Sequence, residues 1–386
     1  MSILTLPREL QLHILGLLSV SELMQLSQTC RRLKDLARDP SLWRKLTLTY
    51  NMIKNNTVAC RDHVSRCSNL QELFITVKER SIRSDKIMSV VMRAKDSLRS
   101  FDISHNYPGL ARDPGLSNSS VKKFAKITQL RKLSLSGVNI RPDGMTELGK
   151  LTELTTLKVM GLGIYDFEEW YPDIVNLFGD LKKLEQVKIS IGPGPFSDKI
   201  VESLVTNNPS LSHLDINSRF CRLFFNDKNV GTTLGKNIIN IITEKCPKLT
   251  HIDLGCLDII ENDDLLKLAT NCVNLKFANF EETRIEDSTL AMLARNCKNL
   301  ESLNVSWCEN ITEKGIEAFL NLSSKESLKQ LDITECEFLY IDDYENDHHV
   351  EKRLVQEYPL IKIVYDMEND ESDQDESSNS DYDLDY

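Results

Sequence analysis

Ten cysteines and seven histidines are the residues of this chain best suited to hold a metal ion or to act as nucleophiles. No two cysteines have the Cys-x-x-Cys spacing that is typical of zinc ribbons and fingers. His348 and His349 follow Asp347, but adjacent side chains on a helix diverge by about 100°, which favours a solvated helix face. We therefore predict no metal site.

The short motifs of common enzyme classes are also missing from the sequence. It contains no Gly-x-x-x-x-Gly-Lys-Ser/Thr loop, no Gly-x-Ser-x-Gly turn and no His-Glu-x-x-His helix. Gly192–Pro195 is rich in glycine, but its prolines lack the N–H groups that would cradle a phosphate. We predict a protein without catalytic residues and without a cofactor.

The charge of the chain is concentrated at its C-terminal end. The 386 residues include 58 acidic and 47 basic side chains, and residues 366–386 hold ten of the acids and no Lys or Arg. The rest of the chain is close to neutral, which argues against nucleic-acid binding. We expect the acidic tail to be disordered. No apolar stretch is long enough for a bilayer and no signal peptide is visible, so we expect no membrane contact and a cytoplasmic or nuclear location, where thiols stay reduced.

A repeat occupies most of the chain. The pattern Leu-x-x-Leu-x-Leu, with other apolar residues in some positions, occurs eleven times between Leu70 and Tyr365, and its first leucines lie on average 29 residues apart. The alternation predicts a short strand with one buried side. A stretch with helical spacing follows, for example behind Asn262 or Thr312, which we expect to be N-caps.

One such unit cannot bury its own apolar face, so the units must stack. Helices need more lateral room than strands, so the stack should bend with parallel strands inside and helices outside. This α/β arrangement resembles the leucine-rich-repeat horseshoe. The later copies resemble its cysteine-containing subtype, and we expect those cysteines to be buried near backbone polar groups. They are Cys67, Cys246, Cys272, Cys297, Cys308 and Cys336.

Three departures from the repeat could be binding loops or neutral insertions. They are the Pro/Gly-rich segment Asn106–Ser120, the break at Gly192–Pro195 and a loop around Phe220–Gly235.

Residues 1–46 do not follow the repeat. They predict three short helices: one with Pro7 at its first position, one after Ser19 or Ser21, and one from Arg31 to Arg38. So small a unit makes a thin core, so some of its apolar residues should be covered by another protein. The alternative is a cap that only seals the first repeat.

The apolar positions of this segment, together with Leu6-Pro7-Arg8-Glu9-Leu10, Cys30-Arg31-Arg32-Leu33 and Leu42-Trp43, resemble an F-box along their whole length. Glu22 and Thr29 are mild departures from that pattern. An F-box before leucine-rich repeats resembles the substrate receptors of SCF-type cullin–RING ubiquitin ligases. We therefore divide the chain into an F-box (1–46), about eleven repeats (47–365) and the acidic tail (366–386).

The resemblance implies that the F-box binds an SKP-family adaptor and, through it, a cullin–RING core, while the repeats bind an unknown protein substrate. The adaptor-binding residues it implies are Leu6, Pro7, Glu9, Leu10, Ile14, Leu18, Leu23, Leu26, Cys30, Leu33, Leu42 and Trp43. Two alternatives stay open: an F-box scaffold that acts outside a ligase, and a leucine-rich-repeat interaction protein whose N-terminal helices are a cap.

Strand residues that flank the buried pair should point into the concave face. The central position of each strand gives one column: Phe74, Asp102, Ser134, Lys158, Lys188, Asp215, Asp253, Asn279, Asn304 and Asp332. Its neighbours include Lys132, His213, His251, Phe277 and Trp307. The lysines should make the middle of the face basic, and the aspartates its later half acidic. The predicted substrate-binding residues are Lys132, Lys158, Lys188, Asp215, Asp253 and Trp307.

Overall fold

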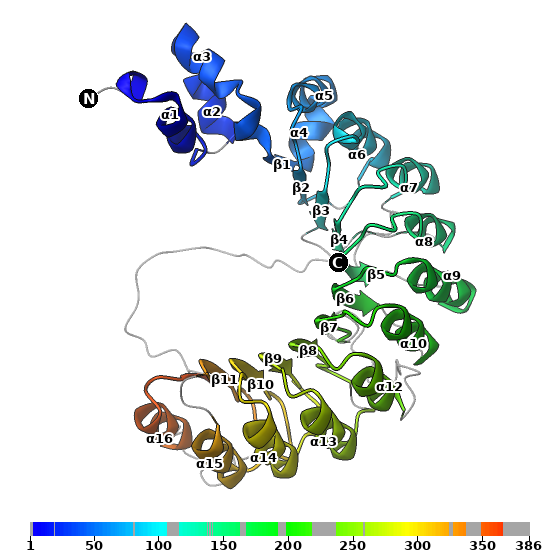
Figure 1. Ribbon diagram of the computed structural model, residues 1–386, viewed down its shortest axis with the longest axis vertical. Helices are drawn as coiled ribbons and strands as arrows, with labels where there is room; N and C mark the ends of the chain where they lie inside the picture. Colours follow the sequence, from blue (N-terminus) through cyan, green and yellow to red (C-terminus); the bar gives the residue numbers. More distant parts are fainter. Residues whose placement is uncertain are drawn as a thin grey trace, which may run out of the picture.

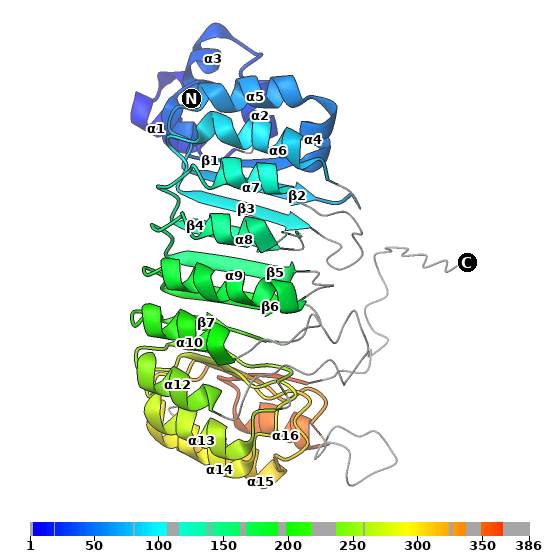
Figure 2. The same ribbon diagram turned by 90° about the vertical axis from the view of Figure 1, so that its right-hand side faces the viewer.

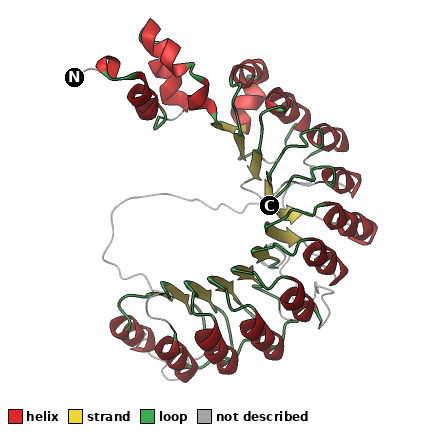
Figure 3. Ribbon diagram, in the orientation of Figure 1, coloured by secondary structure: helices red, strands yellow, loops and turns green. Residues whose placement is uncertain are grey.

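The computed structural model is an arc in which twelve parallel strands line the concave side and helices form the outer side (Figure 1). The strands follow one another across the sheet in sequence order, from β1 to β12. Colouring by secondary structure separates the two layers (Figure 3). This confirms the predicted horseshoe fold. The structure describes residues 3–18, 20–79, 82–105, 116–136, 138, 140, 142–162, 167–191, 198–217, 237–257, 259–323, 327–336 and 349–365.

The strands are longer in the first half of the arc than in the second. The first six are β1 (Lys45–Thr49), β2 (Glu72–Val77), β3 (Ser100–His105), β4 (Lys132–Ser136), β5 (Thr156–Leu162) and β6 (Gln186–Ile191). The six that follow have three residues each: β7 (His213–Asp215), β8 (His251–Asp253), β9 (Phe277–Asn279), β10 (Ser302–Asn304), β11 (Gln330–Asp332) and β12 (Lys362–Val364).

Side chains end the short strands. From β7 to β11 the last strand residue is Asp or Asn, and its side-chain oxygen accepts a hydrogen bond from the backbone N–H two residues later. In β8, Oδ1 of Asp253 accepts from the Gly255 N–H at 3.0 Å. Such Asx turns bend the backbone away from the extended conformation, so the strand cannot continue.

The outer helices stack along the arc (Figure 2). They are α4 (Tyr50–Asn55), α5 (Thr57–Arg66), α6 (Ser84–Val91), η3 (Met92–Ala94), α7 (Asn118–Phe124), α8 (Pro142–Leu148), α9 (Phe167–Asp180), α10 (Asp198–Asn207), α12 (Ile238–Lys245), α13 (Asn262–Asn271), α14 (Asp287–Asn296), α15 (Glu313–Leu322) and α16 (His349–Glu357). One continuous buried cluster from Leu15 to Ile363 joins them to the strands.

The expected helix caps are only partly as predicted. Thr312 is the N-cap of α15, where its hydroxyl accepts from the Gly315 N–H. Asn262, in contrast, is the first residue of α13, and its Oδ1 accepts from the Glu286 N–H of the next repeat at 3.0 Å. Asp287 does the same one repeat later, accepting from the Thr312 N–H at 2.9 Å. The side chain thus stabilises the neighbouring helix start instead of its own.

The repeat cysteines are buried thiols, as predicted. The Cys308 thiol donates to the Phe280 carbonyl and the Cys336 thiol to the Val305 carbonyl, each at 3.2 Å. Burial raises the pKa of Cys272 to about 11. These side chains are therefore protonated and serve packing. Within the described residues, no cluster of three or more His, Cys, Asp or Glu side chains is placed to bind a metal ion.

The N-terminal unit contains η1 (Ile3–Thr5), α1 (Arg8–Leu15), α2 (Val20–Leu26), α3 (Arg31–Ala37) and η2 (Pro40–Trp43). Pro7 precedes α1 as its N-cap, one position earlier than predicted. The sheet begins at Lys45, so β1 spans the predicted boundary at residue 46. None of the helices in the described ranges is long and apolar enough to cross a bilayer.

Several sequence predictions concern residues outside the described ranges. They are residues 106–115 of the insertion Asn106–Ser120, the break at Gly192–Pro195, the loop around Phe220–Gly235, His348 and the acidic tail at 366–386.

Candidate functional site

Helix α1 turns an apolar stripe toward solvent. Leu10 and Ile14, on the helix, are 50% and 37% exposed, and Leu17, just after it, is 77% exposed. Their spacing of four and three residues places them on one side of the helix and its continuation. We call these three residues the α1 ridge. A helix of a monomeric protein usually turns such a stripe inward, so the ridge is a candidate binding surface.

A polar residue occupies the inward side of the same helix. Gln11 is only 1% exposed, and its Nε2 donates to the carbonyls of Ile3 and Leu6 at 3.0 and 2.9 Å. These bonds hold η1 against α1, and Leu15 packs beside them in the core. The orientation of α1 is therefore fixed by Gln11 and Leu15, which leaves the ridge outside.

The twelve predicted adaptor-binding residues fall into three groups. The exposed group is Pro7, Glu9, Leu10, Ile14 and Cys30. The half-buried group is Leu6, Leu18, Leu26 and Leu42. The buried group is Leu23, Leu33 and Trp43, which we now assign to the internal packing of the unit instead of its surface.

Trp43 joins the N-terminal unit to the repeats. Its Nε1 donates to the Ala37 carbonyl at 2.7 Å, and its ring makes an edge-to-face contact with His63 of α5 at 4.6 Å. Trp43 stands three residues before Leu46 and five residues before Leu48. This is the position of the first leucine in the other repeats. Trp43 is therefore the first core residue of an additional repeat, which the leucine pattern alone did not reveal.

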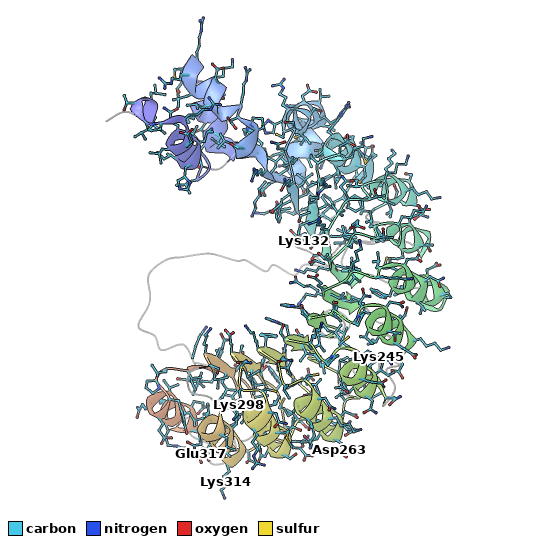
Figure 4. All side chains as sticks on the ribbon, in the orientation of Figure 1. Lys132, Lys245, Asp263, Lys298, Lys314 and Glu317 are labelled. Carbon is cyan, nitrogen blue, oxygen red and sulfur yellow. The ribbon has the colours of Figure 1, made fainter. Side chains whose placement is uncertain are left out.

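The second candidate surface is the concave face of the sheet. The predicted column is in register on consecutive strands: Lys158 pairs with Lys188, Lys188 with Asp215, and Asp215 with Asp253. Lys132 lies on β4 in the neighbouring column, beside Thr156. Figure 4 shows Lys132 on the inner side of the arc, whereas Lys245 and Lys314 belong to the outer helices.

Where the predicted basic and acidic halves meet, the charged side chains are paired within the protein. Lys188 forms an ion pair with Asp215. The Asn217 amide bridges the carboxylates of Asp215 and Asp253 at 2.5 and 3.2 Å. Burial and the nearby Asp253 raise the pKa of Asp215, an effect that the Lys188 ammonium opposes. Asp253 is buried and holds an Asx turn, so it supports the fold.

A pocket of about 330 Å³ lies over strands β5 to β9. Its polar and aromatic lining includes Thr156, Lys158, Gln186, Lys188, His213, Asp215, His251, Asp253 and Phe277. We call it the concave pocket. His213 and His251 stack with their ring centroids 3.8 Å apart and their planes at 14°. Phe277 continues the row at 6.1 Å from His251. The sequence indicates this row because an aromatic or imidazole ring occupies the same strand position in three consecutive repeats.

Trp307 lies outside this pocket. Its side chain is half exposed, and it lies just after β10 with a left-handed backbone conformation (φ 60°). Its backbone N–H donates to the Thr334 carbonyl. Cys256, Glu282 and Glu335 have the same conformation at the equivalent positions of their repeats. This backbone therefore belongs to the repeat, and it does not single out Trp307 as a binding residue.

Two family profiles and a curated protein are similar to parts of the chain. The F-box-like family profile matches residues 3–49, and a Leucine Rich repeat profile matches residues 296–320. An Arabidopsis thaliana protein described as F-box/LRR-repeat protein 21 is 26% identical over 261 residues, which cover 64% of this chain and 72% of that protein. A solved structure of Leiomodin-1 Actin-Binding Site 2 covers 34% of this chain and 78% of its own, with 23% identity. Its TM-score of 0.27 is too low to support any argument.

Proposed function

Because the chain is an F-box protein with leucine-rich repeats, we propose that it is the substrate-recognition subunit of an SCF-type ubiquitin ligase. In this role its N-terminal unit binds an SKP-family adaptor, and through it a cullin–RING core. Its concave face holds a protein substrate for ubiquitination and degradation by the proteasome. The chain itself performs no bond chemistry, since its contribution is to raise the effective concentration of substrate near the conjugating enzyme. We expect it to act in the cytoplasm or the nucleus.

The α1 ridge is the observation that carries this proposal. Three large aliphatic side chains face solvent on a unit whose interior is already filled by Leu15, Leu23 and Leu33. Covering them would remove apolar surface from water, which is the main favourable contribution to most protein associations. Helix α1, which carries the ridge, lies at the opposite end of the arc from α16, so the two ends of the molecule are separate surfaces (Figure 1).

Affinity purification of the tagged full-length chain separates this proposal from its two alternatives. Recovery of adaptor and cullin supports the ligase, adaptor alone supports a scaffold outside the ligase, and neither supports a plain cap. Replacing both Leu6 and Pro7 with alanine should remove adaptor and cullin together, since Pro7 is exposed and Leu6 is half-buried beside α1. Full recovery of both proteins with this variant would contradict the proposal.

Point substitutions are preferable to deletion of residues 1–46. That deletion would remove Trp43 and Leu46 from the core and would cut off the first two residues of β1. A loss of binding could then come from a damaged first repeat.

A further inference from the structure

The concave pocket combines an apolar floor with polar and aromatic side chains around it. The buried side chains Leu157, Val187 and Leu214 line it from below. Its volume of about 330 Å³ is close to the lower limit of about 300 Å³ for small-molecule pockets. The pocket is therefore suited to a single large side chain of a partner, and a folded surface would not enter it.

The row of rings on one side of the pocket is held in place before any partner arrives. Ser212 Oγ lies 2.8 Å from Nδ1 of His213, and Thr250 Oγ1 lies 2.8 Å from Nδ1 of His251. Each hydroxyl also donates to a backbone carbonyl, at 3.1 Å in both cases. Because the rings are fixed, a flat guest loses little of its binding energy to ordering them.

The rings are also uncharged near neutral pH. Burial lowers the pKa of His213, and burial together with His213 and Lys276 lowers the pKa of His251. Neutral stacked rings favour contact with another aromatic ring, in edge-to-face or offset geometry.

The charges around the pocket leave one cation available. The Asp215 carboxylate is occupied by Lys188 and Asn217, and the Asp253 carboxylate by Asn217 and the Gly255 N–H. Within the part of the chain that the structure describes, the Lys158 ammonium has no hydrogen-bond or ion-pair partner. An anionic group is therefore the complement of the free charge in this pocket.

We propose that the concave pocket binds an aromatic side chain of the substrate that lies two residues from a carboxylate. The ring packs against the row formed by His213, His251 and Phe277, and the carboxylate pairs with Lys158. This inference rests on the proposed function, because it names the substrate feature that the receptor would select.

The spacing of the two groups follows from the sheet. Lys158 is on β5 and His213 is on β7, so their backbones are two strand spacings, or about 9.6 Å, apart. Residues i and i+2 of an extended peptide are about 7 Å apart, and their side chains reach the remaining distance. A phosphorylated residue is a poorer complement, because its charge of about −2 would meet a single free ammonium.

Binding of labelled peptides to the full chain in complex with the adaptor tests this proposal. The probe is fluorescein-Gly-Ser-Tyr-Gly-Glu-Ser-Gly, compared by fluorescence anisotropy with a Tyr→Ala peptide and a Glu→Gln peptide. We expect the parent peptide to bind about three- to tenfold more tightly than either altered peptide. If all three bind alike, the proposal is overturned.

Substitutions in the protein should cancel one preference each. Lys158→Gln should remove the preference for Glu over Gln and keep the preference for Tyr, whereas His251→Ala should do the reverse. His251→Phe keeps a flat ring and should restore the Tyr preference, which distinguishes a lost contact from a lost fold. Lys362→Gln, an exposed lysine on β12 of the same sheet and outside the pocket lining, is the matched control and should change neither preference.

Two further outcomes are decisive. A Lys158→Gln variant that keeps the full preference for Glu would overturn the assignment of the anion contact. Tighter binding of a peptide with phosphoserine in place of Glu and Ala in place of Tyr would overturn the proposed preference for an aromatic residue with a carboxylate. If the adaptor fails to co-purify but the isolated full chain keeps both peptide preferences, the proposed ligase role fails and the pocket assignment stands.

Discussion

Truncation of the α1 ridge is the sharpest test of the adaptor interface. The variant Leu10→Ala/Ile14→Ala/Leu17→Ala removes only atoms that are exposed in the free chain or lie just beneath the surface. Substitutions at exposed positions usually change the free energy of unfolding by less than about 0.5 kcal/mol each. The variant should therefore fold, and its effect should appear in binding.

The size of the binding effect follows from the exposed fractions. Full burial of a Leu or Ile side chain contributes about 2 kcal/mol. Scaled by exposures of 50%, 37% and 77%, the ridge could contribute about 1, 0.7 and 1.5 kcal/mol on becoming covered. Together this is about 3 kcal/mol, or a loss of affinity of roughly 200-fold, and it is an upper limit because alanine keeps Cβ.

Isothermal titration calorimetry of the purified chain with an SKP-family adaptor measures the affinity, and the melting temperature shows whether each variant is folded. Val58→Ala and Leu360→Ala are the matched controls, because these side chains are 64% and 85% exposed on other parts of the molecule. The controls should bind normally. If the folded triple variant keeps its affinity within about threefold, the adaptor does not use the ridge and the reasoning is wrong.

Two more predictions concern stability. A Cβ at Gly315 would lie 1.9 Å from Oδ1 of Asp287 and would displace the carboxylate, so we expect Gly315→Ala to lower the free energy of unfolding by about 2 kcal/mol in urea. Gly179→Ala, where the added Cβ meets nothing within 4 Å, should instead raise it by up to about 1 kcal/mol, and a loss at both sites would refute the steric argument. Burial lowers the pKa of His213 and His251 in the folded state, so the unfolded state binds more protons as pH falls through about 6.5. The melting temperature should therefore fall between pH 7.5 and 5.5, and a double substitution to glutamine that falls equally far would contradict this.

The repeat was predictable because its signal is redundant. A period of two within each strand and a recurring spacing between strands fix which residues share a column, and the observed pairs from Phe74 to Asp332 follow that column. The repeat that contains β1 was not predicted, because its first core position is a tryptophan, Trp43. Without the leucine pattern, the sequence assigns Trp43 only to the F-box motif.

The chemistry of the concave face was less predictable than its geometry. Residue type places an aspartate on a face, but it does not say whether its oxygens are already used. Asp253 accepts from a turn and from Asn217, and Lys188 is neutralised by Asp215, so both contribute less to the surface charge than their types suggest. Likewise, the outward orientation of α1 depends on Gln11, whose two hydrogen bonds to backbone carbonyls cannot be read from spacing.

The side chains of Asn262 and Asp287, which accept from the backbone of the following repeat, have a consequence for how the chain assembles. Each of these bonds runs from an earlier repeat to a later one, so a helix start is completed by residues that the ribosome has already made. A newly synthesised unit thus meets a finished template on one side, and order can grow along the arc in the direction of translation. Because the bonds run in one direction along the chain, removal of the last repeat leaves the helix starts of the earlier repeats intact. Removal of an early repeat leaves backbone N–H groups of the next repeat without their acceptors.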